Sequence, residues 1–176
     1  MFSMLGRYIF LAVFAFPGVQ LIYYIFTPLT IYPSFWILDM LYDRVSVFSG
    51  TSTIFVSGSY IDIVEACVAG AAYFLLIVLN MATPMPVKTR IKSLAIIIFS
   101  FLIINIIRIV VFVVLYNSGY DYFDITHKLV WYAGSTILVV VIWFSQDLIL
   151  KLKVIPLYTD IRSVIKDIKQ GGKIFG

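Results

Sequence analysis

Four stretches of this chain are each long and apolar enough to cross a lipid bilayer as a helix. They are residues 8–30, 64–82, 93–116 and 129–150. A bilayer core about 30 Å thick needs about 20 apolar residues in helical form. A chain of 176 residues that is 62% hydrophobic and 12% charged cannot bury so much apolar surface in a water-soluble core. The sequence therefore predicts an all-α integral membrane protein, a four-span transmembrane helix bundle that forms a single domain over residues 1–150.

The positive charges that flank the spans predict their orientation. Two prolines break the chain between the second and third spans, and Lys88, Arg90 and Lys92 follow them. Under the positive-inside rule this loop is cytoplasmic. With the loop inside, only Arg44 and Lys128 flank the spans on the other side. We therefore expect a multi-pass protein of the cell membrane with both termini in the cytoplasm.

Two regions outside the spans are expected to have structure of their own. The tail over residues 151–176 places apolar and charged side chains on opposite helical faces, which predicts a basic amphipathic helix on the inner leaflet. A tail packed on the cytosolic domain of a partner is the alternative. In the outer loop we expect a short, aromatic-rich interfacial helix near residues 34–47. Two β-like runs, residues 53–56 and 60–64, then predict a small extracytoplasmic hairpin that leads into the second span.

One arginine lies where lipid disfavours charge. Arg108 is surrounded by isoleucine and valine in the third span, and an ionisable group at mid-bilayer costs about 2.5–3.5 kcal/mol. Asn105 stands one turn earlier, so the amide and the guanidinium share a helical face that we expect to point into the bundle. The alternative is that Arg108 reaches the outer headgroups, because Tyr116 is only about 12 Å further along the helix.

Cysteine and histidine each occur once, and the predicted topology places both in the outer third of the membrane with Arg108. Cys67 lies near the start of the second span, and His127 at the outer mouth of the fourth. A lone cysteine in an apolar helix is more often a small packing residue, and an interfacial histidine often bonds a nearby acid such as Asp124. Their shared depth with Arg108 instead favours a Cys–His pair with a cationic stabiliser. Glu65 either satisfies amides of the first helical turn or holds His127 or Arg108 in place.

Composition removes several other classes of function. The formal charge of +4 suggests nucleic acid, but the basic residues flank the membrane spans rather than form one patch, so no nucleic-acid partner is expected. A single cysteine forms neither an intrachain disulfide nor a cysteine-rich metal site. We expect no cofactor.

Three motifs in this order resemble the exosortase/archaeosortase family of membrane cysteine transpeptidases. They are the β-like lead-in that ends at Cys67, the intramembrane Asn105 to Arg108 segment, and His127 at the opening of the last span. The resemblance covers roughly residues 50–150. It implies that Cys67 is the nucleophile and that Arg108 and His127 complete the catalytic site. In the family a small hydroxyl residue and then glycine commonly follow the cysteine, whereas here the glycine, Gly70, comes one residue later.

The family also implies a substrate and a product. Such an enzyme cleaves the C-terminal sorting signals of exported proteins and transfers the cleaved proteins to a lipid-linked acceptor in the membrane. Its clients have a short C-terminal motif, a hydrophobic span and a basic tail. We expect the client's span to lie against the small residues Ala69–Ala72 and its motif to add to the hairpin as a strand. The chain is shorter than most relatives, so a homo-oligomer or a partner is a further expectation.

Two other classes of function remain open. The first is a non-enzymatic multi-span assembly or transporter subunit, in which Asn105 and Arg108 join helices and Cys67 only packs. The second is a thiol redox or acyl-carrier enzyme of the membrane, which the absence of a second cysteine disfavours.

Overall fold

The computed structural model describes residues 4–48, 50–83 and 85–150. In these residues the chain forms α1 (Met4–Leu41), β1 (Val45–Val47), β2 (Thr53–Val56), β3 (Ser59–Asp62), α2 (Glu65–Val68), α3 (Gly70–Ala82), α4 (Val87–Asn117), α5 (Phe123–Leu129), the π-helix η1 (Val130–Gly134) and α6 (Ser135–Leu150). The predicted amphipathic helix of the tail belongs to residues 151–176 and lies outside the described residues.

Four helical segments of the described chain are long and apolar enough to cross a membrane. They are Gly18–Leu41, Glu65–Ala82, Val87–Asn117 and Phe123–Leu150. This agrees with the predicted class, a mostly helical membrane protein. The third segment begins earlier than predicted, because Pro86 is extended and α4 starts directly after it.

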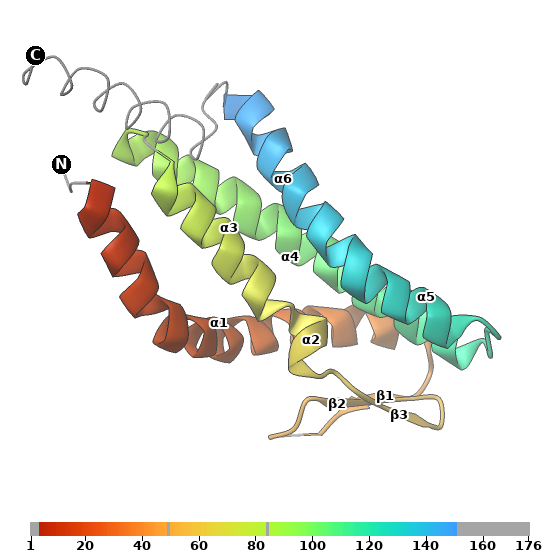
Figure 1. Cartoon of the computed structure of the whole chain (residues 1–176). Coiled ribbons are helices and arrows are strands. Elements are labelled where there is room, and N and C mark those ends of the chain that lie inside the picture. The colour runs from red at the N-terminus through yellow and green to blue at the C-terminus, as the bar shows by residue number, and fades with distance from the viewer. Residues whose placement is uncertain (1–3, 49, 84, 151–176) are drawn as a thin grey trace, which may run out of the picture.

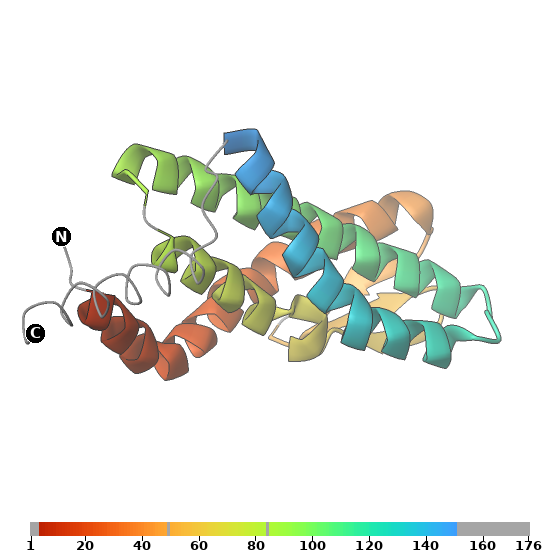
Figure 2. The same cartoon turned by 45° about the horizontal axis from the view of Figure 1, so that its top comes forward.

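The helices form a bundle with a small sheet at one end. Helices α3, α4 and α6 lie side by side, and α1 packs across α3 and α4 (Figure 1). Figure 2 shows the same bundle turned, with α6 passing across α4. Hydrogen bonds join these two helices at two levels, from Ser93 to Gln146 and from Arg108 to Ser135. The end of α3 and the start of α4 lie at the end of the bundle away from the sheet (Figure 1). The cations Lys88, Arg90 and Lys92, predicted in a loop, belong to the first turns of α4. Which end faces the cytoplasm stays a prediction of the positive-inside rule.

Helix α1 corrects one expectation about the first span. It continues without interruption to Leu41, whereas the sequence predicted a span over residues 8–30 and a separate interfacial helix over 34–47. No glycine or polar cluster follows residue 30 to end the helix, and the burial of Leu38 in the core stabilises its last turns. The helix is bent in its first half (Figure 1), as expected for the proline–glycine pair at 17–18.

The sheet has three antiparallel strands in the order β1-β2-β3, with β3 at an edge. Strands β2 and β3 correspond to the predicted hairpin. Strand β1 was predicted as part of the interfacial helix, and this is wrong. Its β-branched Val45 and Val47 pack against the buried core next to Ile54 and Val56 of β2, and this packing favours a strand.

Aromatic rings fill the interface between α1, α3 and α4. Tyr73 of α3 is fully buried and stacks on Phe26 of α1 with ring centroids 4.0 Å apart. It also meets Phe101 of α4 edge to face at 4.6 Å. Such ring pairs contribute about 0.5–1.5 kcal/mol beyond their buried area. They therefore help to hold α1 against α3 and α4.

The small-residue face at the start of α3 is partly covered by α1. The ring of Tyr23 lies so close to Gly70 that a Cβ added there would be 2.6 Å from a ring carbon. Ala71 remains exposed, while Ala69 is buried. The Ala69–Ala72 face that we expected to receive a client's span is therefore occupied by α1 at Gly70, since glycine allows a helix to approach closely.

A sealed polar cluster joins the helices at the end away from the sheet. The Asn80 amide donates to Ser93 Oγ, and the Ser93 hydroxyl donates to Gln146 Oε1, which links α3, α4 and α6. All three side chains are fully buried. We call these three residues the loop-end cluster. Next to it, Arg90 donates to the carbonyls of Asn80, Met81 and Thr83 and so caps the end of α3.

Candidate active site

A break between α2 and α3 shapes the backbone around Cys67. Ala69 adopts the left-handed conformation, with φ 59° and ψ 39°, which costs a residue with a Cβ about 1–2 kcal/mol. The break corrects the expectation of one uninterrupted helix over residues 64–82. It occurs because groups from another helix take the carbonyls of Cys67 and Val68, which a regular helix would use for its own hydrogen bonds.

Two polar residues of α4 bind these carbonyls. Asn105 Nδ2 donates to the carbonyls of Cys67 and Val68 at 3.1 and 3.2 Å. Arg108 Nη2 donates to the same Cys67 carbonyl at 2.8 Å, and its Nη1 donates to Ser135 Oγ of α6 at 3.0 Å. Asn105 is fully buried and Arg108 half-buried, so both point into the bundle as predicted. We call Asn105, Arg108, Ser135 and these two carbonyls the sheet-end cluster.

The imidazole of His127 is held by aromatic rings. It lies nearly parallel to Phe123 with centroids 5.5 Å apart, and it meets Phe112 of α4 edge to face at 4.9 Å. The side chain is half-buried, and its nitrogens make no hydrogen bond to any described residue, Asp124 included. Both ring nitrogens therefore remain available for proton transfer.

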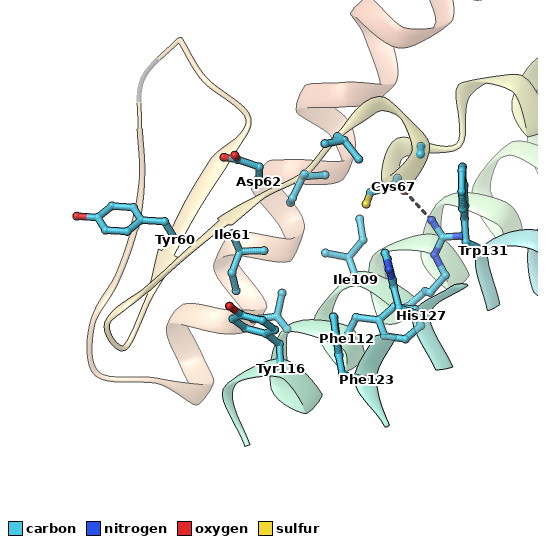
Figure 3. A pocket seen from close by; sticks show the side chains of 15 residues that line it. Tyr60, Ile61, Asp62, Cys67, Ile109, Phe112, Tyr116, Phe123, His127 and Trp131 are labelled. Atoms are coloured by element: carbon cyan, nitrogen blue, oxygen red, sulfur yellow. Dashed lines mark hydrogen bonds between the residues drawn. The ribbon is translucent and has the colours of Figure 1, made fainter. Parts of the chain in front are cut away.

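A cavity of about 430 Å³ brings together the three side chains that the sequence singled out. Cys67, Arg108 and His127 come from α2, α4 and α5, and all three line it. Figure 3 shows the Cys67 thiol and the His127 ring on the same cavity, with the bond from Arg108 to the Cys67 carbonyl dashed. No hydrogen bond joins the thiol to the imidazole in the described structure.

Most of the cavity wall is apolar or aromatic. Beside the three residues above, it is lined by Tyr60, Ile61, Asp62, Ile63, Val64, Ala66, Ile109, Phe112, Val113, Tyr116, Phe123 and Trp131. Its volume falls within the range of about 300–1,000 Å³ that is usual for ligand sites. A small number of polar groups on an apolar wall is the usual composition of a binding site for an organic ligand.

The two supporting residues expected from the sequence differ in their placement. Asn105 binds the Cys67 carbonyl from beneath the cavity. Glu65 is exposed, lies in the first turn of α2 and does not line the cavity. Of the two roles considered for Glu65, its place in the structure matches the acid of a first helical turn, where a carboxylate interacts favourably with free amides.

Sequence reasoning missed several residues of the site. Ser135, the second partner of Arg108, is the first residue of α6 and follows a π-helix that no sequence pattern predicted. Trp131 of this π-helix and the strand β3 also line the cavity. The pair Gly134-Ser135 in an otherwise apolar span is the one signal that pointed to a helix contact there.

The arrangement suits nucleophilic chemistry on a carbonyl group. It offers a thiol, an imidazole able to accept a proton and a guanidinium with two of its five N–H donors used in described contacts. Among the described residues, no group of three or more His, Cys, Asp or Glu side chains is placed to bind a metal ion. In comparisons with family models, curated proteins and solved structures, no match to this chain was found.

Proposed function

We propose that this chain is a membrane cysteine transpeptidase of the exosortase/archaeosortase type, which cleaves C-terminal sorting signals of exported proteins. One observation carries the proposal. Cys67, Arg108 and His127, from three separate helices, line one cavity, although nothing in their sequence spacing requires them to meet. A thiol, a base and a cation around one cavity are the parts that acyl transfer needs.

The chemistry follows from these groups. His127 accepts the thiol proton, and the Arg108 guanidinium next to the Cys67 backbone favours the thiolate. The sulfur attacks a peptide carbonyl, and an unused N–H of Arg108 stabilises the oxyanion. The C–N bond then breaks, and the leaving amine takes the proton from His127, which leaves a thioester on Cys67. A lipid-linked amine or hydroxyl then attacks the thioester and gives its proton to His127. The C–S bond breaks, the Cys67 sulfur takes this proton back, and the client is left anchored in the membrane.

The conformation of Ala69 supports the resemblance on separate ground. In the family, glycine commonly stands two residues after the cysteine, at the position that Ala69 occupies here. Ala69 has a positive φ, a conformation that glycine adopts without steric cost. A break in the helix at this point would explain both the family's glycine and the strain that this chain accepts.

The proposal includes a location. The cavity lies at the sheet end of the bundle, and the positive-inside rule assigns this end to the extracytoplasmic face. An exported client with a C-terminal motif, a hydrophobic span and a basic tail would bring its cleavage site to the same level. The acceptor lipid would reach the thioester from the outer leaflet.

The test is processing of such a client in cells or in proteoliposomes, followed by gel shift and mass spectrometry. Cys67→Ala should abolish processing and leave the amount of folded protein unchanged. Intact processing by Cys67→Ala would rule out the nucleophile. A cysteine placed at Asn117 should react with an impermeant thiol reagent in intact cells, and one placed at Thr89 should not.

A second function has its own support. The described hydrogen bonds of Asn105 and Arg108 all go to groups of α2 and α6, as expected if these residues only join helices in a non-enzymatic assembly or transporter subunit. In that case Cys67→Ala has no effect on any client. A loss of assembly in Arg108→Ala would then be the main phenotype.

A further inference from the structure

Within the described part of the chain, strand β3 has an unpaired edge, and the ladder determines which backbone groups face outward. In an antiparallel pair, successive residues direct both N–H and C=O alternately toward the partner strand and away from it. The N–H of Ile63 donates to the Ser52 carbonyl at 2.9 Å, so the backbone N–H and C=O of Ile63 point toward β2. The register then directs Ile61 toward β2 as well. Consequently Tyr60 and Asp62 direct their N–H and C=O groups away from the sheet.

This free edge belongs to the wall of the Cys67 cavity. Tyr60 and Asp62 both line the cavity, and Figure 3 shows β3 leading toward Cys67. Val64 continues the extended conformation, with φ −72° and ψ 163°, up to the start of α2. Tyr60 and Asp62 are both exposed, so a chain that enters the cavity can reach their outward backbone groups, as at other open sheet edges.

The opposite wall limits what can pair with this edge. Phe112 and Tyr116 of α4 line the cavity together with β3. An added strand needs a spacing of about 4.8 Å from β3, and a cavity of about 430 Å³ has room for a few extended residues. It has no room for a second sheet, so a short extended peptide fits the edge inside the cavity and another copy of this chain does not.

We propose that β3 is the strand that binds the client, and that an extended polypeptide segment pairs with the outward backbone groups of Tyr60 and Asp62. Pairing fixes the segment along the line that leads to Cys67 and so presents a peptide carbonyl to the thiol. Main-chain bonds supply affinity, and alternate side chains of the client face the aromatic wall and supply specificity. The inference rests on the proposed function, because it names how that site recognises its substrate.

The test uses reactive strand-forming peptides on the full chain in lipid nanodiscs. The probes are a hexapeptide of alternating valine and threonine with a C-terminal chloromethyl ketone, and two isomers that are N-methylated on alternate residues. The measurement is the rate of Cys67 alkylation, relative to that by iodoacetamide. We expect one isomer to react as fast as the parent and the other at least about tenfold slower. The slower isomer is the one in which methyl groups replace the N–H groups that would bond β3. Equal rates for all three probes would overturn the proposal.

A pair of variants at one position provides the control on the protein side. Asp62→Pro removes an outward N–H and leaves the bonds between β2 and β3 intact, as an edge strand permits. Asp62→Ala keeps the N–H and loses only the carboxylate that accepts the Thr53 hydroxyl. We expect Asp62→Pro to slow the parent and the tolerated isomer by about threefold to tenfold more than Asp62→Ala does, because only the proline removes the outward N–H. Equal slowing by both variants would overturn the proposal.

Three further outcomes separate this inference from the alternatives. A chain that is dimeric in nanodiscs and becomes monomeric with Asp62→Pro pairs β3 with a second copy, which would overturn client pairing. Equal probe rates together with Cys67-dependent processing of a client would refute strand pairing alone. A difference between the isomers without any Cys67-dependent processing would refute the proposed function and keep the peptide-binding edge.

Discussion

Two polar clusters join α4 and α6 to the second span, one at each end of the bundle: the loop-end cluster through α3 and the sheet-end cluster through α2. The loop-end cluster is fully buried, and its side chains bond mainly one another. The sheet-end cluster binds a broken stretch of backbone and borders a cavity that also contains a thiol and an imidazole. Interhelical hydrogen bonds in membranes stabilise a bundle, so both clusters can act as glue. Of the two, the sheet-end cluster has donors next to a described cavity large enough for a ligand.

Among side chains of the two clusters, the largest effect is expected for Arg108→Lys. Lysine keeps the charge, but it cannot hold the Cys67 carbonyl and Ser135 Oγ with one planar group. We expect client processing to fall about 100-fold, the usual cost of losing an oxyanion donor. The measurement is the single-turnover rate at equal amounts of folded protein. A change in stability without a change in rate would make the sheet-end cluster a structural element like the other.

At the loop end, Gln146→Leu is expected to act on stability alone. The substitution leaves the buried Ser93 hydroxyl without its acceptor, at a cost of about 1–2 kcal/mol in the free energy of unfolding. Unfolding by SDS titration, followed by tryptophan fluorescence, measures this cost. The processing rate of the folded fraction should equal that of the wild type. A lower processing rate would mean that the loop-end cluster also affects the site at the sheet end, and the two clusters would then not differ in role.

Ser135→Ala tests how far the site depends on the second partner of Arg108. The variant removes one hydrogen bond and leaves the charge and the Cys67 carbonyl contact in place. We expect the processing rate to drop about threefold to fivefold, with stability reduced by about 1 kcal/mol or less. Ser93→Ala, in the loop-end cluster, is the matched control, and it should lower stability without slowing processing.

The smallest effect is expected for Ala69→Gly. Glycine adopts the left-handed conformation freely, so the variant should stabilise the fold by roughly 0.5–1 kcal/mol and keep its processing rate. A β-branched residue at the same position, Ala69→Val, should be destabilising. If Ala69→Gly instead unfolds more easily, the break at this residue does not store the strain we attribute to it.

The spans and the inward face of the third span could be predicted from the sequence, because both follow from the cost of polar groups in lipid. A run of about 20 apolar residues has few alternatives to a helix, and Asn105 and Arg108 on one face have to find partners inside the bundle. Their partners could not be predicted. The backbone of Cys67 and the hydroxyl of Ser135 are brought to α4 by tertiary packing between segments far apart in the sequence.

The errors also have physical reasons. Val45–Val47 became a strand because an adjacent strand and the core stabilise it there, a contact that a local pattern does not contain. The left-handed conformation of Ala69 contradicts the preference of alanine for the right-handed helix. Hydrogen bonds from Asn105 of α4 to the carbonyls of Cys67 and Val68 compensate for its cost. That Cys67, Arg108 and His127 share a cavity was a hypothesis about depth, and spacing alone could not establish it.

The π-helix between α5 and α6 determines which side chains of the last span share a direction. Eight residues separate His127 from Ser135, and in a regular helix they would point about 80° apart. A π-turn takes in one extra residue per turn, so the two positions become equivalent to residues seven apart, nearly in line. His127 and Ser135, which bonds the Arg108 guanidinium, therefore lie on one stripe. A one-residue insertion within Val130–Gly134 would rotate one of them by about 100° and take the two out of line without changing any side chain of the site. A one-residue deletion that restores a regular helix would keep them in line.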